Sequence, residues 1–220
     1  MEAFHYDTID STNEEAKRLV RAGRITGPAF VLAEGQTAGK GQFGRTWCSP
    51  PNAGIYLSVL DVSRRPIDLP FPLLTLSGGV ACAEAIRRRT GIDVRLKPIN
   101  DLYVDGRKLG GILTETVSVG NRVEAFITGV GINVHGVPRD IPEGTTRPVC
   151  IQDLLDRARF LDLDINALAA DLVFSIHSWN NRVLGGDIEG LRQAWERNRV
   201  ADAPLPIPLQ TALDGHIAQN

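Results

Sequence analysis

Residues 95–115 read RLKPINDLYVDGRKLGGILTE, and this stretch predicts β-structure at the centre of the chain. A short apolar strand leads to Lys97, Asp105–Gly106 has the composition of a turn, and a glycine-containing strand follows over Leu109–Val117. We expect that strand to form a β-hairpin with Val123–Val134. The fold is therefore expected to be built around a sheet.

The flanking segments predict further strands and several helices. Strands are expected at Pro28–Ala33, at Ile55–Leu60, where the polar residues 61–66 follow, and at Ile92–Leu96, and the hairpin turn is expected at Gly120–Asn121. Helices are expected over Glu15–Ala22, Thr75–Thr90, Asn166–Arg182 and Asp187–Arg197. Ser11 and Glu14 have the spacing of a capping box, and Gly91 is the expected end of the second helix. The chain is thus expected to be mixed α and β.

Composition narrows the class of protein. The 220 residues are 43% hydrophobic and 23% charged, and 24 Lys and Arg face 26 Asp and Glu, which excludes binding of nucleic acid through overall basicity. No apolar run approaches the ~20 residues of a membrane span, and the N-terminus does not resemble a secretory signal. Cys48, Cys82 and Cys150 lack the spacing of a zinc site or a disulfide framework, which favours the reducing cytoplasm.

A glycine-rich segment follows the first expected strand. Residues 36–47 read QTAGKGQFGRTW, where the glycines let backbone N–H groups approach an anion and Lys40 and Arg45 add charge. The segment contains G-x-G-x-x-G, but no helix follows it, so a dinucleotide-binding turn is excluded. The motifs of protein kinases and of the P-loop are absent as well. On this segment alone, a flexible surface loop is an equal alternative.

Two lysines and an asparagine lie at the ends of apolar strands. Burial of a cation is unfavourable unless it meets an anion, so we expect Lys97 and Lys108 to bind one, the alternative being a hairpin with charged flanks. Asn133 ends the strand segment Gly129–Asn133, in which glycines indicate close approach of a ligand or of another backbone. A packing constraint within the sheet is equally compatible with these glycines.

Taken in order, five segments resemble the catalytic domain of the biotin protein ligases, the biotin–[acetyl-CoA-carboxylase] ligase family. They are Asp10–Asn13, Gln36–Trp47, Lys97 with Asn100–Leu102, Gly106–Leu113 and Gly129–Asn133. The resemblance covers residues 5–197. It implies an α+β fold, a mixed β-sheet flanked by helices, followed by a small C-terminal SH3-like domain.

The resemblance also implies a reaction. A biotin ligase uses ATP and Mg²⁺ to convert biotin to biotinyl-AMP with release of pyrophosphate, and then transfers biotin to a lysine of the biotin carboxyl carrier protein. One anion attacks another in the first step, so fixed cations and Mg²⁺ would offset the charge that gathers at phosphorus. A glycine-rich loop that orders over the ligand would keep the intermediate from water.

Site residues follow by resemblance, motif by motif. The implied biotin site comprises Ser11, Thr12, Asn13, Gln36, Gly39, Lys40, Gly41, Gln42, Lys97 and Gly111. The implied ATP and adenylate site comprises Lys40, Gln42, Arg45, Trp47, Lys97, Asn100, Lys108 and Asn133, with Asn133 also near Mg²⁺. Lys97, Lys40 and Lys108 are the implied catalytic residues. Hydroxyl and amide groups suit the ureido ring of biotin, and Trp47 would either stack on adenine or anchor the core.

Three departures from the family pattern leave alternatives open. Lys40 and Gln42 replace two arginines of the G-R-G-R-x-G-R loop, and Pro98–Ile99 replaces the Trp–Pro of K-W-P-N-D. By family proportions, residues 200–220 would be a partial or reduced C-terminal domain or tail after a catalytic domain of residues 1–199. The prolines of Ala203–Pro208 predict a linker or an extended segment there. The alternatives are a lipoate or octanoate ligase or transferase of the same superfamily, and a biotin-binding protein that has lost turnover.

The expected partners follow from the same resemblance. The motifs begin within a dozen residues of Met1, so no helix-turn-helix is expected before them, and neither nucleic acid nor membrane is an expected partner. Biotin and the carrier protein are expected to bind, and a homodimer is expected because edge strands often pair in the family. The expected location is the cytoplasm.

Overall fold

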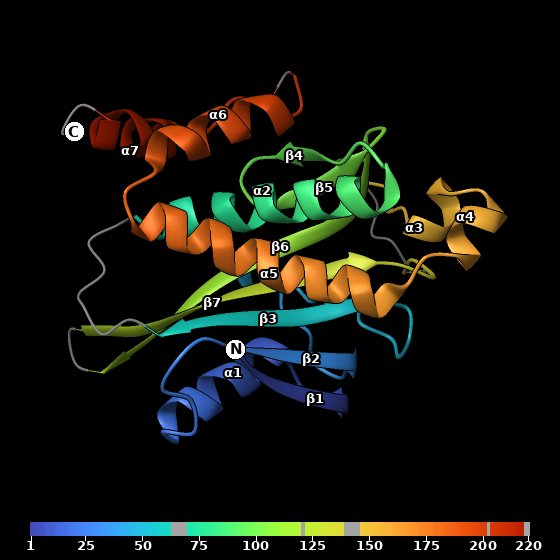
Figure 1. The fold of residues 1–220 in the computed structure, drawn as a ribbon, viewed down its shortest axis with the longest axis horizontal. Coiled ribbons are helices and arrows are strands. Elements are labelled where there is room, and N and C mark those ends of the chain that lie inside the picture. The colour runs from blue at the N-terminus through green and yellow to red at the C-terminus, as the bar shows by residue number, and fades with distance from the viewer. Residues whose placement is uncertain (63–69, 120–121, 139–145, 202, 218–220) are drawn as a thin grey trace.

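The computed structural model describes residues 1–62, 70–119, 122–138, 146–201 and 203–217 (Figure 1). In chain order, the strands are β1 (Glu2–Ile9), β2 (Ala29–Gln36), β3 (Gly54–Val62), β4 (Arg95–Lys97), β5 (Asp101–Val104), β6 (Arg107–Val119) and β7 (Arg122–Asn133). The helices are α1 (Thr12–Arg21), α2 (Phe71–Thr90), α3 (Ile151–Leu154), α4 (Arg157–Leu161), α5 (Ile165–Leu184), α6 (Ile188–Asn198) and α7 (Ile207–Ile217), with a single 3₁₀ turn at Gln42–Gly44.

The strands form one seven-stranded sheet in the order β1-β2-β3-β7-β6-β5-β4. β1 and β2 pair in parallel and the other neighbours pair antiparallel, so the sheet is mixed and the expected fold class is confirmed. β6 and β7 are the long hairpin that the sequence predicts. The predicted turn at Gly120–Asn121 lies outside the described residues.

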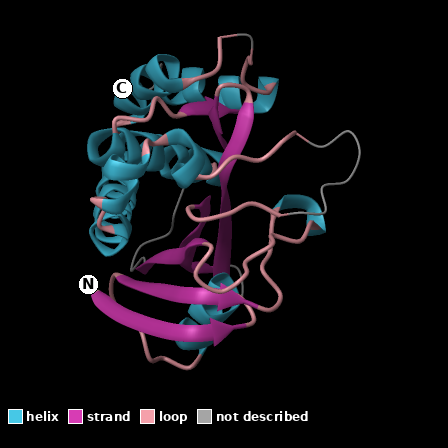
Figure 2. Cartoon of the chain, turned by 90° about the vertical axis from the view of Figure 1, so that its right-hand side faces the viewer, coloured by secondary structure: helices cyan, strands magenta, loops and turns pink. Residues whose placement is uncertain are grey.

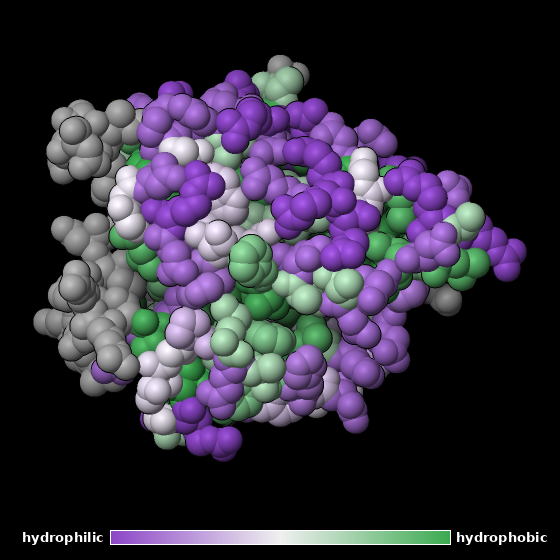
Figure 3. All heavy atoms as spheres, in the orientation of Figure 1, coloured by the Kyte–Doolittle hydropathy of each residue, from purple (hydrophilic) through white to green (hydrophobic). Residues whose placement is uncertain are grey.

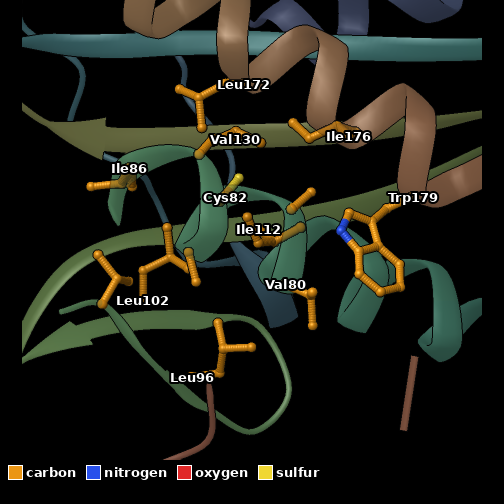
Figure 4. Close-up of a cluster of buried hydrophobic side chains, with 14 of the residues drawn as sticks. Val80, Cys82, Ile86, Leu96, Leu102, Ile112, Val130, Leu172, Ile176 and Trp179 are labelled. Carbon is orange, nitrogen blue, oxygen red and sulfur yellow. The ribbon is translucent and has the colours of Figure 1, made fainter. Parts of the chain in front are cut away.

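Helices pack on both faces of the sheet (Figures 1 and 2). α2 and α5 lie side by side on one face, and α1 packs on the other face against β2, β3, β6 and β7. Figure 4 shows the larger core between α2, α5 and the strands, where Leu102, Ile112 and Val130 meet Cys82 and Leu172. A second, smaller core lies beneath α1. The sheet therefore has two covered faces, which differ in what covers them.

The exposed surface follows from these layers. Figure 3 shows mostly hydrophilic residues over the helices and a hydrophobic area below α5. Phe174 of α5 is exposed, whereas Phe30 and Leu32 of β2 are half-buried. Within the described residues, no helix combines the length and the hydropathy that a membrane span requires.

The C-terminal end of α2 agrees with the sequence prediction, whereas the N-terminal start of α1 does not. Gly91 ends α2 in the left-handed region at φ 73°, as predicted. Ser11 precedes α1, but its side chain makes no capping hydrogen bond, so the predicted capping box is wrong. The reason is that the carboxylate of Glu14 binds Lys17 and Lys40 instead of turning back to the backbone of the helix start.

The sequence analysis did not predict β1, although residues 2–9 alternate between the two faces. Phe4 and Tyr6 point to the α1 side and pack against the smaller core, while His5 lies edge-on to Phe30 on the opposite side. β1 pairs only with β2, so it is an edge strand of the sheet. Its charged and half-exposed composition is typical of such a position.

The end of the described chain is helical, contrary to the expected extended tail. α7 packs against α2 and α6, with Leu205, Leu209 and Leu213 buried. Pro204 and Pro206 precede α7, and Pro208 lies in its first turn, where the missing N–H group is tolerated. The prolines therefore mark the start of a helix, and the division of the chain at residue 199 stays a prediction.

We expect Leu213→Ala to lower the free energy of unfolding by about 2–4 kcal/mol, because it removes a fully buried side chain and leaves a cavity. Urea denaturation of this variant and of Gln210→Ala, an exposed position on the same helix, measures the difference. Equal stability of the two variants would show that α7 does not pack on the core.

Asp61 is buried within β3, although its position predicts a polar strand end. Its carboxylate accepts hydrogen bonds from His177 Nδ1 at 2.6 Å and from Asn180 Nδ2 at 3.0 Å, both on α5. Asn180 also accepts from Ser77 of α2 at 2.8 Å. This network joins β3, α2 and α5 through the larger core, and it allows β3 to continue to Val62.

The hydrogen bond to Asp61 raises the pKa of His177 above its usual value, against the opposing effect of burial. A raised folded-state pKa means that the stabilisation is complete below the unfolded pKa of about 6.5 and is lost as pH rises through the folded pKa. The stability difference between wild type and His177→Ala should therefore be larger at about pH 6 than at about pH 9. Urea denaturation at both pH values checks this, with the exposed Phe174→Ala as control, and an identical difference at both would contradict it.

Candidate functional site

Four residues from separate motifs lie in one row across the sheet. The register pairs Lys97 of β4 with Asp101 of β5, Asp101 with Gly111 of β6, and Gly111 with Gly131 of β7. Directly paired residues point to the same face of a sheet. That face is the one covered by α1, because Ile112, next to Gly111, points to the α2 side. Three motifs that are far apart in sequence thus meet on one surface.

The glycines of this row leave room for Trp47. A Cβ atom on Gly131 would lie 2.3 Å from Trp47 Nε1, whereas one on Gly111 would lie 3.6 Å from Trp47 Cζ3. The indole is therefore packed directly against the backbone of β7. Its Nε1 is buried and has no hydrogen-bond partner in the described structure. An unpaired donor of this kind at a site is available to a ligand acceptor.

Lys108 lies above the same indole. Its Nζ is 5.5 Å from the centroid of the Trp47 ring and 2.7 Å from Asp101 Oδ1. Both charged side chains of this pair are about three-quarters covered, at 26% and 21% exposure. In this structure Lys108 pairs with a carboxylate of the neighbouring strand, which fits the alternative of a hairpin with charged flanks, and its binding of a ligand anion stays a prediction.

Lys97 is exposed, so the prediction that it is a buried strand-end cation is wrong. Its Nζ lies 3.4 Å from the Tyr103 hydroxyl and 5.1 Å from the centroid of that ring. β4 is only three residues long and lies at the edge of the sheet, which explains why its last side chain remains accessible. A depression of about 730 Å³ opens beside Lys97 and Tyr103 and is also lined by Arg159 and Val200.

Buried polar groups form a cluster at the start of α1, above the sheet. Gln36 Oε1 accepts from the Thr12 backbone N–H at 2.8 Å. The Ser58 hydroxyl donates to Asn13 Oδ1 at 2.6 Å and lies 2.8 Å from the Thr12 hydroxyl. Asn13 Nδ2 donates to Glu115 Oε2 at 2.8 Å. Ser11, Thr12 and Asn13 are all buried, and their contact with biotin stays a prediction.

Asn13 needs a glycine below it. A Cβ atom on Gly129 would lie 2.3 Å from Asn13 Oδ1, so β7 can approach α1 this closely only without a side chain there. The packing alternative for the Gly129–Asn133 motif thus has structural support, since its glycines make room for Asn13 and for Trp47, whereas close approach of a ligand stays a prediction.

The glycine-rich segment is held at its base. Trp47 N–H donates to Gly39 O at 2.9 Å, and Gly41 N–H donates to Arg45 O at 2.8 Å. A Cβ atom on Gly39 would lie 2.4 Å from Trp47 O, which explains the glycine. Phe43 at the tip has φ 58° and is 88% exposed. The segment is therefore an ordered loop whose base is attached to Trp47 and whose tip points into solvent.

Lys40 extends from this loop to α1, where its Nζ lies 2.6 Å from Glu14 Oε1. The same oxygen accepts from Lys17 at 2.8 Å. Hydrogen bonds from Lys17 and then from Lys40 lower the pKa of Glu14 to about 2, against the effect of burial. Burial alone would lower the pKa of Lys17, but its hydrogen bonds to Glu115 and Glu14 outweigh burial and raise it.

The remaining predicted residues take the following places. Asn100 Nδ2 donates to Ile112 O at 3.2 Å, so its amide fastens the loop after β4 to β6. Asn133 is buried at the end of β7 and donates to Val149 O at 3.1 Å. Gln42 is half-buried and Arg45 is exposed on the glycine-rich loop. Their roles toward ATP or biotin stay predictions.

The sequence analysis missed Ser58, Glu115 and Lys17 as parts of this site, and gave Asp101 no role of its own. Ser58 offered a signal, since a hydroxyl in the otherwise apolar β3 must find a partner once it is buried. The carboxylate of Glu115 and the ammonium of Lys17 offered no local signal, because they meet only when α1 lies on β6.

The described residues contain no group of three or more His, Cys, Asp or Glu side chains that could hold a metal ion. Mg²⁺ is commonly held by one or two protein oxygens together with phosphate oxygens and water. Asp101 supplies a carboxylate, and Asn133 commits its nitrogen, not its oxygen, to Val149.

Replacement of Gly131 by Ala should displace the Trp47 indole and lower the free energy of unfolding by about 1–3 kcal/mol, since the Cβ has no room. Gly111→Ala is the matched control, because its Cβ would make an ordinary contact with the same ring. The difference in fluorescence between each variant and its Trp47→Phe counterpart reports on this indole. A Trp47 signal unchanged by Gly131→Ala would place the ring elsewhere.

Comparison with known proteins shows which family the sequence matches. The sequence pattern of the family described as biotin/lipoate A/B protein ligase matches residues 6–133. A biotin–[acetyl-CoA-carboxylase] ligase from Paracoccus denitrificans is 36% identical over 168 residues, which is 73% of this chain and 68% of that protein. The bifunctional ligase/repressor BirA of Bacillus subtilis is 37% identical over 143 residues, 64% of this chain but only 42% of the relative's length.

Solved structures share the fold. The chain superimposes on a biotin protein ligase from Leishmania major in complex with biotin at a TM-score of 0.70, with 23% identity, over 92% of this chain and 83% of that one. A biotin protein ligase from Aquifex aeolicus in complex with biotin and ATP gives a TM-score of 0.67 at 24% identity, over 90% and 78% of the two chains. The matched family pattern includes α1, the glycine-rich loop and the row of β4 to β7, and the chain belongs to the biotin/lipoate A/B protein ligase family.

Proposed function

We propose that the chain is an ATP-dependent biotin protein ligase that activates biotin as biotinyl-AMP and transfers it to a lysine of a biotin carboxyl carrier domain. One observation carries the proposal. Lys108 contacts both Asp101 and the Trp47 indole, and the indole lies over Gly111 and Gly131. This arrangement supports the binding of a flat organic acid next to a cation. The names of the relatives supply the identity of that acid.

The two steps balance as follows. A carboxylate oxygen of biotin attacks the α-phosphorus of ATP, the bond to the bridging oxygen breaks, and pyrophosphate leaves. The amine of the carrier lysine then attacks the acyl carbon, AMP leaves with the bonding electrons, and the amine loses a proton. Both steps gather negative charge, so nearby fixed ammonium groups lower the barrier.

In this proposal, each part of the site has one task. Thr12, Asn13 and Gln36 face the ureido ring, because their hydroxyl and amide groups both donate and accept hydrogen bonds. Lys108 and Lys97 hold the carboxylate and the α-phosphate. The loop of residues 39–47 covers the ligand and excludes water. Asn100 and Arg45 remain proposed contacts of the adenylate.

In this proposal, Asp101, Asn133 and the phosphates of ATP would hold Mg²⁺, because they supply oxygen donors of the kind that this ion prefers. When bound, it supplies charge neutralisation at the phosphate oxygens. The cytoplasm as location and a homodimer as assembly are proposed on family grounds alone.

The second candidate is a lipoate or octanoate ligase or transferase. Pro98–Ile99 in place of Trp–Pro favours it, because the residues after Lys97 border the site and the family pattern includes lipoate ligases. A biotin-binding protein without turnover is the third candidate, favoured by Gln42 in place of an arginine.

Pyrophosphate release distinguishes the candidates. The protein is incubated with ATP, Mg²⁺ and either biotin, lipoate or octanoate, with and without a biotin carboxyl carrier domain. Biotin-dependent release followed by labelling of the carrier lysine is the expected result. Release with lipoate or octanoate alone would select the second candidate, and biotin binding without any release the third.

Lys97→Ala and Lys108→Ala should each slow biotin-dependent pyrophosphate release by about 10²–10³-fold, with a smaller effect on biotin affinity, because a fixed charge acts most strongly where charge develops. Arg107→Ala, at the neighbouring position on β6, is the control. Near-normal release by both lysine variants would exclude the proposed roles.

A further inference from the structure

The lysines of this chain are few and gathered in one place. Of 24 Lys and Arg residues only four are lysines, namely Lys17, Lys40, Lys97 and Lys108. Lys97 belongs to the row, the ammonium of Lys108 meets Asp101 of the row, Lys17 reaches from α1 to β6, and Lys40 reaches from the loop to α1. An ammonium on a flexible stem can exchange one anion for another more readily than the planar guanidinium fork of arginine can.

Lys17 and Lys40 share one carboxylate but are held differently. Both lie within hydrogen-bond distance of Glu14 Oε1, Lys17 at 2.8 Å and Lys40 at 2.6 Å. Lys17 has a second carboxylate, Glu115 Oε1 at 2.6 Å, and its side chain is 12% exposed. The Lys40 side chain is 49% exposed, and Glu14 is the only carboxylate that pairs with it in the described structure. An exposed pair of this kind is weak and easily exchanged.

We propose that Glu14 is a positioning residue that holds Lys40 in the ligand-free protein and releases it to an anionic group of the substrate, while Lys17 stays as the partner of Glu14. The inference rests on the proposed function, since that function brings the carboxylate of biotin and the phosphates of ATP to this face. It goes beyond it by giving Glu14 and Lys17 separate roles in the placement of the Lys40 ammonium.

The surroundings make this exchange favourable. Glu14 stays ionised at every pH near neutrality because its pKa is about 2, so the contact does not depend on protonation. When Lys40 leaves, Glu14 and Glu115 still share Lys17, and no buried carboxylate is left without a cation. Gly39 and Gly41 on either side of Lys40 are held by backbone hydrogen bonds with Trp47 and Arg45, so the exchange needs only a rotation of the Lys40 side chain.

The contact also links the loop to the wall of the site. Asn13 binds Glu115, Glu115 binds Lys17, Lys17 binds Glu14, and Glu14 binds Lys40. A ligand that meets Asn13 thus touches a chain of charged contacts that ends on the loop.

The test uses the small number of lysines. Ligand-free protein is acetylated briefly with acetic anhydride, and mass spectrometry measures the rate at each lysine. In Glu14→Gln, Lys40 should react about three- to tenfold faster, because its amine loses its anion, while Lys17 changes less than twofold because Glu115 still holds it. Glu15→Gln, one residue further on α1 and bound to Tyr6 and Arg18, should change neither rate.

Ligand arms identify the anion. Biotin alone and ATP alone are each added to wild-type protein, and the one whose anion receives Lys40 should slow acetylation of Lys40 and leave that of Lys17 unchanged. Equal Lys40 rates in wild type and Glu14→Gln would overturn the pairing. Lack of protection by either ligand would overturn the exchange.

Kinetics provide the second readout. If Glu14 competes with the substrate for Lys40, Glu14→Gln should lower KM for that substrate by about two- to fivefold with kcat unchanged, and should have no effect in a Lys40→Ala background. A higher KM in Glu14→Gln would mean that Glu14 supports the bound state and would overturn the proposal. Absence of pyrophosphate release by wild type would refute the proposed function, whereas the acetylation rates would still decide the role of Glu14.

Discussion

The site depends on three positions where the central strands have no side chain. Gly111 and Gly131 face each other across β6 and β7 and form the floor under Trp47, and Gly129, two residues before Gly131, forms the floor under Asn13. Because the loop that carries Lys40 is fastened to Trp47, the position of the loop follows from the position of the indole. A side chain at Gly129 or Gly131 would push α1 or the loop away from the sheet.

This constraint explains why one face of the sheet carries the larger core and the other face carries the site. On the α2 and α5 face, large apolar side chains interlock around the polar network of Asp61, and Figure 4 shows the apolar part. On the α1 face, the glycines of the long hairpin present bare backbone beside the smaller core, and polar or charged groups from distant segments gather above them. Catalytic and binding groups are thus placed by a rigid scaffold whose stability comes from its opposite side.

The sequence predicted the elements that depend on residues close together in the chain, and it missed contacts between residues far apart in the chain. The β6–β7 hairpin, α2 with its end at Gly91, and the glycine-rich loop all follow from residues close together in the chain. Asp61 was assigned to a polar strand end because its partners, His177 and Asn180, lie 116 and 119 residues further on. Burial of Lys97 was predicted from its strand, but whether that strand lies at an edge is a property of the whole sheet.

The central claim is that the acid binds on the α1 face, over Gly111 and Gly131. A crystal structure of the protein with biotin tests this claim most directly. The account predicts the ureido ring within hydrogen-bond distance of Thr12 or Asn13 and the carboxylate close to Lys108. Biotin bound instead in the depression of about 730 Å³ between Tyr103, Arg159 and Val200, with the α1 face unchanged, would contradict it.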